Sequence, residues 1–423
     1  MISERLIKSG YQAFIVGGAI RDSLLGCQIN DWDVATNATP NIIRGLFPEL
    51  TSFTLKHGTV TLVSQGRHFE LTTFRGIDGF SSSIDEDLAH RDFTFNAIAY
   101  DINAKRIIDP FGGQRDIEEK LVRAVLNPSQ RFQEDPLRIM RAIRFSLELG
   151  YSIEPETLIA IQSMAQTIDT VAKERIRDEL LKILMVKKPS IGFNMMRKLD
   201  LLKRILPELV EGYRKRQNNY HKYTIYRHTM ETVDAINDDP ILRLSALFHD
   251  IAKPRVRKKI NGKWRFFGHA TLSAELTKEI MVRLKFSNEW INRVTHLIAH
   301  HMFDYKQELS DKAVRQFIKR IGADNVGCLI ALRKADEIAH GWGRDSEKDI
   351  ETFTNRIDSQ IKQLYPLTIS GLAVNGHDIM NALNVKPGPR IGQILNQLLA
   401  IVIEKPEFNT KDKLIEIMKH GSL

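Results

Sequence analysis

Cysteine is scarce in this sequence: among 423 residues only Cys27 and Cys328 occur. Two cysteines cannot build a disulfide framework or a cysteine-based zinc site, so the sequence predicts a reducing, cytoplasmic setting. Long apolar runs are also missing. The longest ones, such as residues 398–403, are far shorter than the roughly 20 residues that span a bilayer. The N-terminal residues contain no apolar core of a signal peptide. We therefore expect no membrane partner.

Positively charged residues are in excess in this sequence. Lys and Arg number 61 against 52 Asp and Glu, which gives a net charge of +9. A composition of 43% hydrophobic and 27% charged residues excludes wholesale disorder. The basic excess favours a polyanionic partner such as nucleic acid or nucleotide, although a merely basic enzyme would have the same balance.

The residue pattern changes along the chain. Short β-rich runs separated by Gly, Asn and Asp predict a small mixed α/β domain over residues 1–120. After residue 120, apolar residues recur every three to four positions, which predicts helices. We expect four parts: a head (1–120), a neck (121–210), a histidine-rich helical region (211–345) and a helical tail (346–423). One hairpin is predicted in the third part, with Asn261-Gly262 as its turn.

Two features of the head suggest phosphate chemistry. Gly17 and Gly18 end a predicted strand and precede a helix, so backbone could approach a phosphate there. Asp31 and Asp33 are two residues apart on the next predicted strand and share one face, while Trp32 and Val34 face the other way. Paired carboxylates of this kind suit Mg²⁺ together with substrate phosphates. The plain alternative is a turn followed by a solvated edge strand.

The string GGAIRDSLLG…NDWDVAT resembles the active-site signature of the polymerase β-like nucleotidyltransferases. It most resembles class II tRNA nucleotidyltransferases, the family of CCA-adding enzymes and bacterial poly(A) polymerases. Residues 90–99, 107–117 and 134–145 match further segments of the family in the expected order, and LAVNGHDIM and KPGPRIGQIL extend the resemblance into the tail. The implied fold is an α+β head with a mixed sheet, followed by all-α neck, histidine-rich and tail domains.

The resemblance implies roles for individual residues. Asp31 and Asp33 would be catalytic and hold Mg²⁺, and Glu70 could be a third carboxylate or structural. Nucleotide binding would fall to these residues: Gly17, Gly18, Arg21, Arg91, Asp92, Asn96, Asp135, Arg138, Arg141 and Arg144. Asp135 suits the N-cap of a base-reading helix on which Arg138 and Arg141 share its face. The alternative for that helix is an ordinary surface ion pair.

The histidine-rich region has an order of residues that resembles the HD superfamily of metal-dependent phosphohydrolases. The matching residues are His228, His249, Asp250, His269, His300, His301 and Asp336, with Lys253 after the HD pair. Imidazole and carboxylate suit a divalent metal such as Ni²⁺, Mn²⁺ or Mg²⁺, and neighbouring metals generate hydroxide near neutral pH. The alternative is a degenerate scaffold without metal.

The sequence thus predicts an enzyme that adds nucleotides to the 3′ end of tRNA without a template, with an added phosphohydrolase activity. Its substrates would be CTP, and ATP if it completes the CCA end. Complete CCA-adding relatives have a longer loop after the strand ending in TTFR, whereas here GIDGFSSSIDE alone precedes Asp87. We therefore expect addition of CC with little terminal A. The rivals are a poly(A) polymerase, a hydrolase with an RNA-binding head, and a non-catalytic RNA-binding protein.

Overall fold

The computed structural model describes residues 2–29, 32–54, 58–64, 67–76, 79–219, 221–305, 309–341, 346–362 and 368–419. The chain divides into two compact units, Met1–Pro207 (unit 1) and Glu208–Leu423 (unit 2). Within the described ranges, no helix has both the length and the apolar character needed to cross a membrane. Our four-part division of the chain is finer than these two units and stays a prediction.

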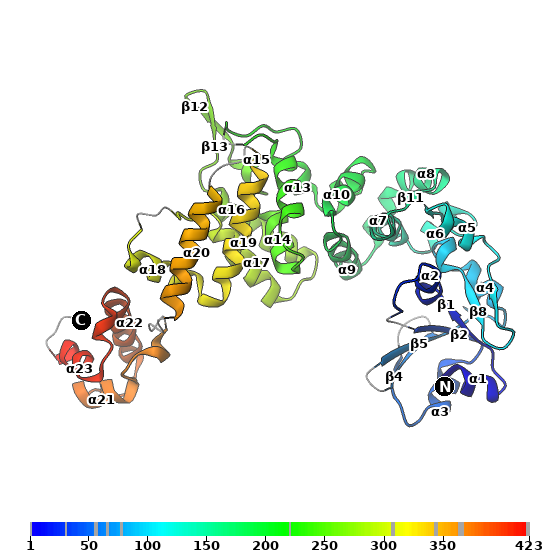
Figure 1. Cartoon of the computed structure of the whole chain (residues 1–423), viewed down its shortest axis with the longest axis horizontal. Coiled ribbons are helices and arrows are strands. Elements are labelled where there is room, and N and C mark those ends of the chain that lie inside the picture. Colours follow the sequence, from blue (N-terminus) through cyan, green and yellow to red (C-terminus); the bar gives the residue numbers. More distant parts are fainter. Residues whose placement is uncertain are drawn as a thin grey trace. The chain divides into compact units, whose positions relative to one another are not determined.

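Unit 1 begins with a mixed sheet, as predicted (Figure 1). Its strands in chain order are β1 Ala13–Val16, β2 Trp32–Thr36, β3 Thr51–Thr54, β4 Thr59–Ser64, β5 Arg67–Thr73, β8 Ala99–Asp101 and β9 Arg106–Ile108. Within the described residues they form a seven-stranded sheet of order β3-β4-β5-β2-β1-β8-β9. β2 and β5 run parallel, and the other neighbours are antiparallel.

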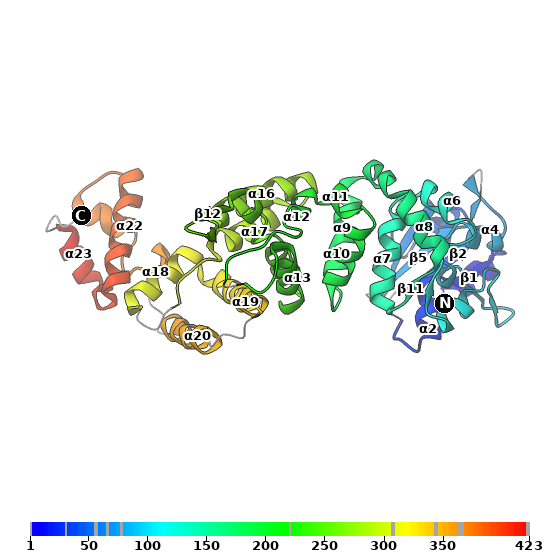
Figure 2. The same ribbon diagram turned by 90° about the horizontal axis from the view of Figure 1, so that it is seen from above.

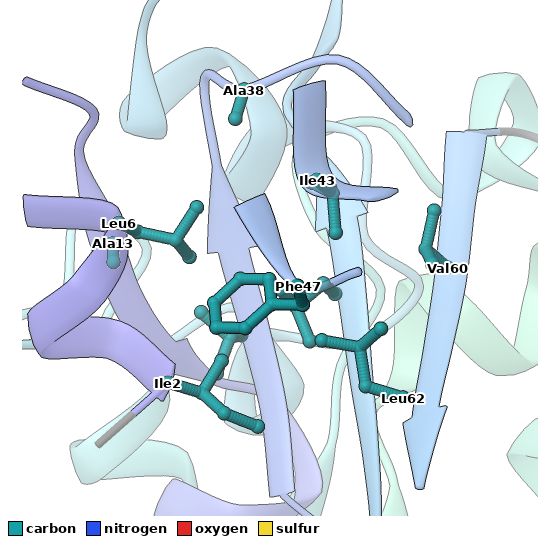
Figure 3. Close-up of a cluster of buried hydrophobic side chains, with 10 residues drawn as sticks. Ile2, Leu6, Ala13, Ala38, Ile43, Phe47, Val60 and Leu62 are labelled. Carbon is teal, nitrogen blue, oxygen red and sulfur yellow. The ribbon is translucent and has the colours of Figure 1, made fainter. Parts of the chain in front are cut away.

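Each face of this sheet is covered by its own hydrophobic cluster. Alternate residues of a strand point to opposite faces, so Ala13 and Val34 enter one cluster while Phe14 and Ala35 enter the other. Figure 3 shows the first cluster, in which Phe47 lies among side chains from two helices and the sheet. The surrounding helices and short strands are α1 Ile2–Lys8, α2 Gly18–Leu24, α3 Pro40–Leu46, β6 Arg75–Gly76, β7 Gly79–Phe80, α4 Ile84–Ala89 and α5 Gly113–Glu118.

Several elements of the head have no counterpart in our sequence prediction, among them α1 and β3. α1 places Ile2 and Leu6 in the core, but a seven-residue helix has too few turns for its hydrophobic periodicity to be recognised. β3 has the sequence TSFT and pairs along one side with β4. A short polar edge strand lacks the alternation that reveals a half-buried strand.

The rest of unit 1 is helical apart from a two-residue parallel ladder between β10 Leu121–Val122 and β11 Ser152–Ile153. Its helices are α6 Pro128–Glu134, α7 Arg138–Leu149, α8 Pro155–Ser163, α9 Lys173–Leu184, α10 Pro189–Lys198 and α11 Leu202–Ile205. The predicted N-cap at Asp135 is wrong: this residue ends α6 in an extended conformation, and α7 has Leu137 as its N-cap. The chain makes a turn after Asp135, in which the amides of Arg138 and Ile139 donate to the backbone oxygens of Asp135 and Pro136, so α7 begins only at Arg138.

In its described residues, unit 2 is built from helices and one hairpin (Figure 1, Figure 2). Its helices are α12 Pro207–Val210, which begins at the unit boundary, α13 Ile225–Ala235, α14 Pro240–Phe248, α15 Lys253–Val256, α16 His269–Arg283, α17 Asn288–His300, α18 Asp311–Ile321, α19 Ala323–Ala339, α20 Ser346–Lys362, α21 Gly376–Leu383, α22 Pro389–Glu404 and α23 Lys411–Lys419. α13 packs against α14 and α19, and α16 packs against α17.

The predicted hairpin is confirmed. β12 Lys258–Ile260 pairs with β13 Lys263–Arg265. Asn261 and Gly262 connect them with φ values of 48° and 76°. Positive φ at both turn residues is what the favoured two-residue hairpin turn requires.

Candidate functional site

A cavity of about 540 Å³ in unit 1 gathers the residues that we predicted for nucleotide binding. All ten of them line it, together with Asp33. Our prediction missed the other lining residues, which are Arg75, Phe145, Arg175 and Lys182. Arg and Lys outnumber Asp along this wall, so the cavity is electrostatically suited to a polyanion such as a triphosphate.

The turn after β1 brings backbone close to charged side chains. Gly17 has a φ of 69°, and a Cβ added there would lie 2.8 Å from Nη1 of Arg91 and 3.2 Å from Oδ2 of Asp33. A larger residue would therefore be strained in its backbone and would push both charges away. The glycine is thus needed for Arg91 and Asp33 to meet at one edge of the cavity.

Asp33 is the described member of the predicted carboxylate pair, since Asp31 lies outside the described residues. Asp33 on β2 is in register with Glu70 on the parallel strand β5. Their side chains project from the same face of the sheet, because Val34 and Leu71 enter the core on the opposite face. Glu70 is exposed and is not part of the cavity lining. Carboxylate oxygens on neighbouring strands fit the ligand preference of Mg²⁺.

A buried carboxylate outside our predicted set organises the arginines of the cavity. Asp87 accepts hydrogen bonds from Nε of Arg75 at 2.9 Å and from Nη2 of Arg91 at 3.1 Å. Burial alone would raise the pKa of Asp87, but the two guanidinium groups hold it below its usual value. The negative charge of Asp87 therefore fixes two cavity cations in place.

Asp92 and Asn96 form a hydrogen-bonded network at the floor of the cavity. Oδ1 of Asp92 accepts hydrogen bonds from its neighbour's backbone amide at 2.8 Å and from Nδ2 of Asn96 at 3.0 Å. The amide oxygen of Asn96 accepts a hydrogen bond from Nη1 of Arg21 at 3.0 Å. Burial would raise the pKa of Asp92, but Arg141 and Asn96 hold it well below its usual value. These contacts join three separate segments of the sequence.

The predicted partners on the base-reading helix differ from those in the structure. Asp135 pairs with Arg175 of α9, at 3.1 Å and 2.8 Å, rather than with Arg138. Arg138 instead donates to Oε2 of Glu134 at 3.0 Å and to the backbone oxygen of His90 at 2.7 Å. The chain turns between α6 and α7, so a helical spacing from residue 135 does not apply. Both residues nevertheless line the cavity.

Phe145 has three guanidinium groups near its ring. The guanidinium carbons lie 4.1 Å (Arg144), 5.4 Å (Arg21) and 5.4 Å (Arg141) from the ring centroid. The sequence could have predicted part of this arrangement, because Arg141 and Phe145 are four residues apart on α7 and therefore lie on one face of the helix. Arg175 and Lys182 are seven apart on α9, which also places them on one face.

The second cluster lies in unit 2, where all predicted metal ligands except His300 converge. The side chains come from α13, the end of α14, the start of α16, the end of α17, and α19: His228, His249, Asp250, His269, His301 and Asp336. Two groups within this set could each hold a metal ion, one of His228, His249 and Asp250 and the other of Asp250, His269 and His301.

Asp250 lies between two pairs of imidazoles. Its Oδ2 is 3.2 Å from Nε2 of His249, and its Oδ1 is 3.4 Å from Nε2 of His269. The Nε2 atoms of His228 and His249 are 3.3 Å apart, and those of His269 and His301 are also 3.3 Å apart. Both carboxylate oxygens of Asp250 are buried without a well-aligned hydrogen bond.

The opposite nitrogen of each ring is anchored to backbone. The Nδ1 atoms of His228, His249, His269 and His301 lie 2.7 to 3.1 Å from backbone oxygens. A ring that donates from Nδ1 carries its lone pair on Nε2, and metal ligands are oriented in this way. Four Nε2 atoms that face one another around the buried carboxylate of Asp250, whose Oδ2 is also paired with Nζ of Lys253, form a set of side chains that could hold cations.

The pKa values reflect the crowding of the cluster. Burial alone would lower the pKa of His249, but Asp250 and Asp336 raise it to about 10. Burial and the charge of His249 lower the pKa of His301 to about 3. Burial would raise the pKa of Asp250, but His249 and Lys253 hold it well below its usual value. Asp250 is therefore ionised, as a metal ligand must be.

The structure does not bring His300 into the cluster. Its Nδ1 lies 2.9 Å from the backbone oxygen of His296, and its ring packs against the ring of His296. Adjacent residues at a helix end point in different directions, so His300 and His301 cannot both face the cluster. The sequence could not distinguish between these two neighbours.

The cluster opens into a cavity of about 510 Å³. His269, His301 and Asp336 line it, together with two histidines that the sequence analysis missed, His221 and His340. His340 is four residues after Asp336, a helical spacing that could have identified it. Burial and the ammonium of Lys253 lower the pKa of His221 to about 2.

Comparison with known families matches both units. The family described as the poly A polymerase head domain matches residues 13–123. The family described as an RNA and SrmB-binding site of polymerase A matches residues 150–212. The family described as tRNA nucleotidyltransferase domain 2 matches residues 258–418.

Individual proteins are similar over the whole length. The CCA-adding enzyme of Lactiplantibacillus plantarum is 30% identical, over 99% of this chain and 94% of its own length. That of Levilactobacillus brevis is 31% identical, over 98% of this chain and 95% of its own length. A crystal structure of the Bacillus stearothermophilus CCA-adding enzyme in complex with CTP is 26% identical. It superposes with a TM-score of 0.73 over 100% of this chain and 96% of that one.

Proposed function

This chain belongs to the CCA-adding enzymes, a family of tRNA 3′-end nucleotidyltransferases, and we propose that it transfers cytidylate from CTP in the cavity of unit 1. The observation that carries this proposal is the meeting of Gly17, Asp33 and Arg91 at one edge of a strongly cationic cavity. The solved relative with CTP supports the choice of nucleotide.

The donor set of the head fits Mg²⁺. Asp33 would hold the ion together with Asp31, with Glu70 available on the adjacent strand. When bound, a pair of Mg²⁺ ions supplies activation of the tRNA 3′-hydroxyl and neutralisation of the triphosphate charge. The remaining work is positioning and charge stabilisation, as in phosphoryl transfer generally.

The arginines of the cavity perform that positioning. Arg21 and Arg91 lie beside the glycine turn and would bind phosphate oxygens. Asp92 and Asn96 present an acceptor and an amide, which suits a ribose 2′-hydroxyl. Asp135 and Arg138 would read the base by hydrogen bonds, in place of a template strand. Arg141 and Arg144 complete the cationic wall.

We also propose that the protein adds the two cytidines in this cavity and adds the terminal adenosine only slowly. The connection between β5 and α4 consists of residues 74–83, and its described ends are fixed. The backbone amide of Arg75 donates to Asp87 at 3.1 Å, and the amide of Ser81 donates to the oxygen of Phe74 at 2.8 Å. So short a connection leaves little length for the loop that helps complete CCA-adding relatives to switch from CTP to ATP.

The test uses tRNA transcripts ending before the CCA sequence and after its second C. CTP and ATP are supplied separately and together, and the products are sequenced. We expect rapid CC addition to the first transcript and slow A addition to the second. A addition at the rate of C addition would replace this proposal with full CCA synthesis, and absence of any addition would overturn the nucleotidyltransferase proposal.

We also propose that unit 2 is a metal-dependent phosphohydrolase. The observation that carries it is the arrangement of four inward-facing Nε2 atoms around Asp250. The residues fit a pair of divalent ions, which when bound supply hydroxide near neutral pH. Lys253, with Nζ 2.6 Å from Oδ2 of Asp250, would hold the charge of a bound phosphate.

The hydrolase is tested with p-nitrophenyl phosphate and with bis(p-nitrophenyl) phosphate. The metal content of the purified protein is measured first, and Ni²⁺, Mn²⁺ and Mg²⁺ are then added in turn. We expect bound divalent metal and hydrolysis of at least one ester. A protein that binds none of these metals and cleaves neither ester would have a degenerate scaffold instead.

A further inference from the structure

The hairpin of unit 2 has an unbalanced charge. No acidic residue occurs in the sequence between Asp250 and Glu275. The segment in between contains seven cations: Lys253, Arg255, Arg257, Lys258, Lys259, Lys263 and Arg265. Three of the seven are anchored within the protein. Lys253 contacts Asp250, Arg255 pairs with Glu211, and Arg257 lies over the ring of Trp264 at 3.4 Å.

One face of the hairpin presents cations to solvent. Lys258 is paired across the strands with Arg265, and Ile260 is paired with Lys263. All four side chains belong to the same face, because alternate residues of a strand share a face. All four are exposed. Among the described residues, Lys258, Lys263 and Arg265 form no ion pair.

Like charges directly opposite each other destabilise a hairpin. The arrangement at Lys258 and Arg265 is therefore costly in the protein alone and favourable when an anion lies across the strands. The opposite face needs no such partner, because Trp264 is covered there by Arg257 and Lys259. The cations of the first face are thus placed for an external polyanion.

The hairpin continues directly into the cavity of the histidine cluster. Arg265 and Phe267 line that cavity together with His269 and His301. Phe267 is 72% exposed and Met302, on the same cavity wall, is 57% exposed. Cations followed by exposed aromatic or apolar side chains are typical of surfaces that bind single-stranded nucleic acid, where bases stack on the rings.

We propose that this hairpin binds the backbone of single-stranded RNA and directs its phosphorylated 3′ end into the histidine cluster. The inference rests on the proposed phosphohydrolase and names its substrate class. Lys258, Lys263 and Arg265 contact backbone phosphates, and Phe267 and Met302 contact the terminal bases. In the reaction, water adds to phosphorus and the bond from phosphorus to O3′ breaks. The 3′ oxygen takes a proton and leaves as a hydroxyl, and inorganic phosphate is released.

The binding test uses a 5′-fluorescent RNA octamer with a 3′-terminal phosphate and a 4-thiouridine as its last base. Affinity is measured by anisotropy at several salt concentrations, and the cross-linked peptide is identified by mass spectrometry. The variant Lys258→Gln/Lys263→Gln is compared with Lys278→Gln/Lys319→Gln. This control pair removes the same charge from exposed positions on α16 and α18.

We expect the cross-link to fall within residues 258–269 or at Met302. Three phosphate contacts on a single strand predict a slope of about −2 for log affinity against log salt, and loss of two contacts changes it by about 1.4. The hairpin variant should bind the octamer at least tenfold more weakly, whereas the control variant should bind like the unmodified protein. Equal binding by both variants, or a cross-link confined to unit 1, would overturn the inference.

Two further readouts separate the possible failures. The ratio of kcat/KM for the octamer to that for p-nitrophenyl phosphate should fall at least tenfold in the hairpin variant. If the metal-loaded protein cleaves neither substrate, the hydrolase proposal fails, and the cross-link still decides the docking surface. Competition by poly-L-glutamate as strong as competition by RNA would show a general anion site and overturn the assignment to RNA.

Discussion

Arg141 donates two hydrogen bonds to one carboxylate oxygen of Asp92, from Nε at 2.8 Å and from Nη2 at 2.5 Å. The contact joins residues 49 positions apart, one before the neck and the other on α7. It also links the segment proposed to bind the ribose to the helix α7, which carries part of the cationic wall. The geometry of the cavity therefore depends on this pair.

We predict that Asp92→Asn raises the KM for CTP at least tenfold. The variant loses the charge that orients Arg141 and the acceptor expected for the ribose. Arg141→Lys alone should raise the KM for CTP in the same way, because an ammonium cannot make two fixed hydrogen bonds to one oxygen. Steady-state nucleotide addition measures both effects, and a normal KM in Asp92→Asn would contradict the proposed role.

Asp33→Ala should abolish nucleotide addition while the protein remains folded. The carboxylate lies at the glycine turn, where it would hold Mg²⁺, and Asp33 does not belong to either hydrophobic cluster of the sheet. Product formation from CTP is measured beside thermal unfolding. Asp85→Ala, an exposed position on α4, is the matched control and should keep full activity. Substantial activity in folded Asp33→Ala would remove this residue from the metal site.

Asp135→Ala and Arg138→Ala should blur the choice of base more than they weaken triphosphate binding. Each variant is assayed with CTP, ATP, UTP and GTP on the same tRNA. Arg175→Ala tests whether Asp135 must be held in place to recognise the base, because Arg175 is the observed partner of Asp135. If all three variants keep the selectivity of the unmodified protein, Asp135 and Arg138 do not read the base, and the contact of Asp135 with Arg175 is an ordinary ion pair.

The head should become less stable in acid, because protonation of Asp87 removes the charge that its two arginines bind. Its pKa is lowered from 3.8 in the folded protein, so its contribution is present above that value and is lost as pH falls below it. Asp87→Asn should cost about 2 kcal/mol at pH 7, since hydrogen bonds to a charged group are lost. Urea unfolding between pH 7 and pH 3 should show the difference between variant and unmodified protein shrinking as the pH falls. A difference that stays constant would contradict the charge argument.

His301→Ala and His300→Ala form a matched pair of adjacent substitutions. His301 faces the cluster and His300 does not, so the first should lose bound metal and ester hydrolysis while the second keeps both. Metal content is measured by mass spectrometry. Nucleotide addition should be nearly normal in both variants, because the ligands lie in unit 2. Equal metal loss in the two variants would point to a general folding defect.

The sequence predicted more of the elements than of the contacts. Short β-rich runs between Gly, Asn and Asp clusters located β1, β2, β4, β5, β8 and β9, and Asn261-Gly262 located the hairpin. Partners distant in sequence were not predictable: the pairing of Asp135 with Arg175 depends on how α9 packs against α7. Asp87 was overlooked because its importance comes from burial between two arginines. The family motifs supplied candidate residues, and tertiary packing decided which of them meet.

The anchoring of the histidine rings to backbone oxygens has an evolutionary consequence. The rings are held in place by the backbone of the folded helices, so we expect that folding does not depend on capture of an ion, unlike in a zinc finger. A lineage can therefore replace these ligands one by one and still keep the scaffold that supports tRNA processing. The proposed phosphohydrolase activity would then be separable from nucleotide addition by point mutation, and natural selection could remove it without rebuilding the protein.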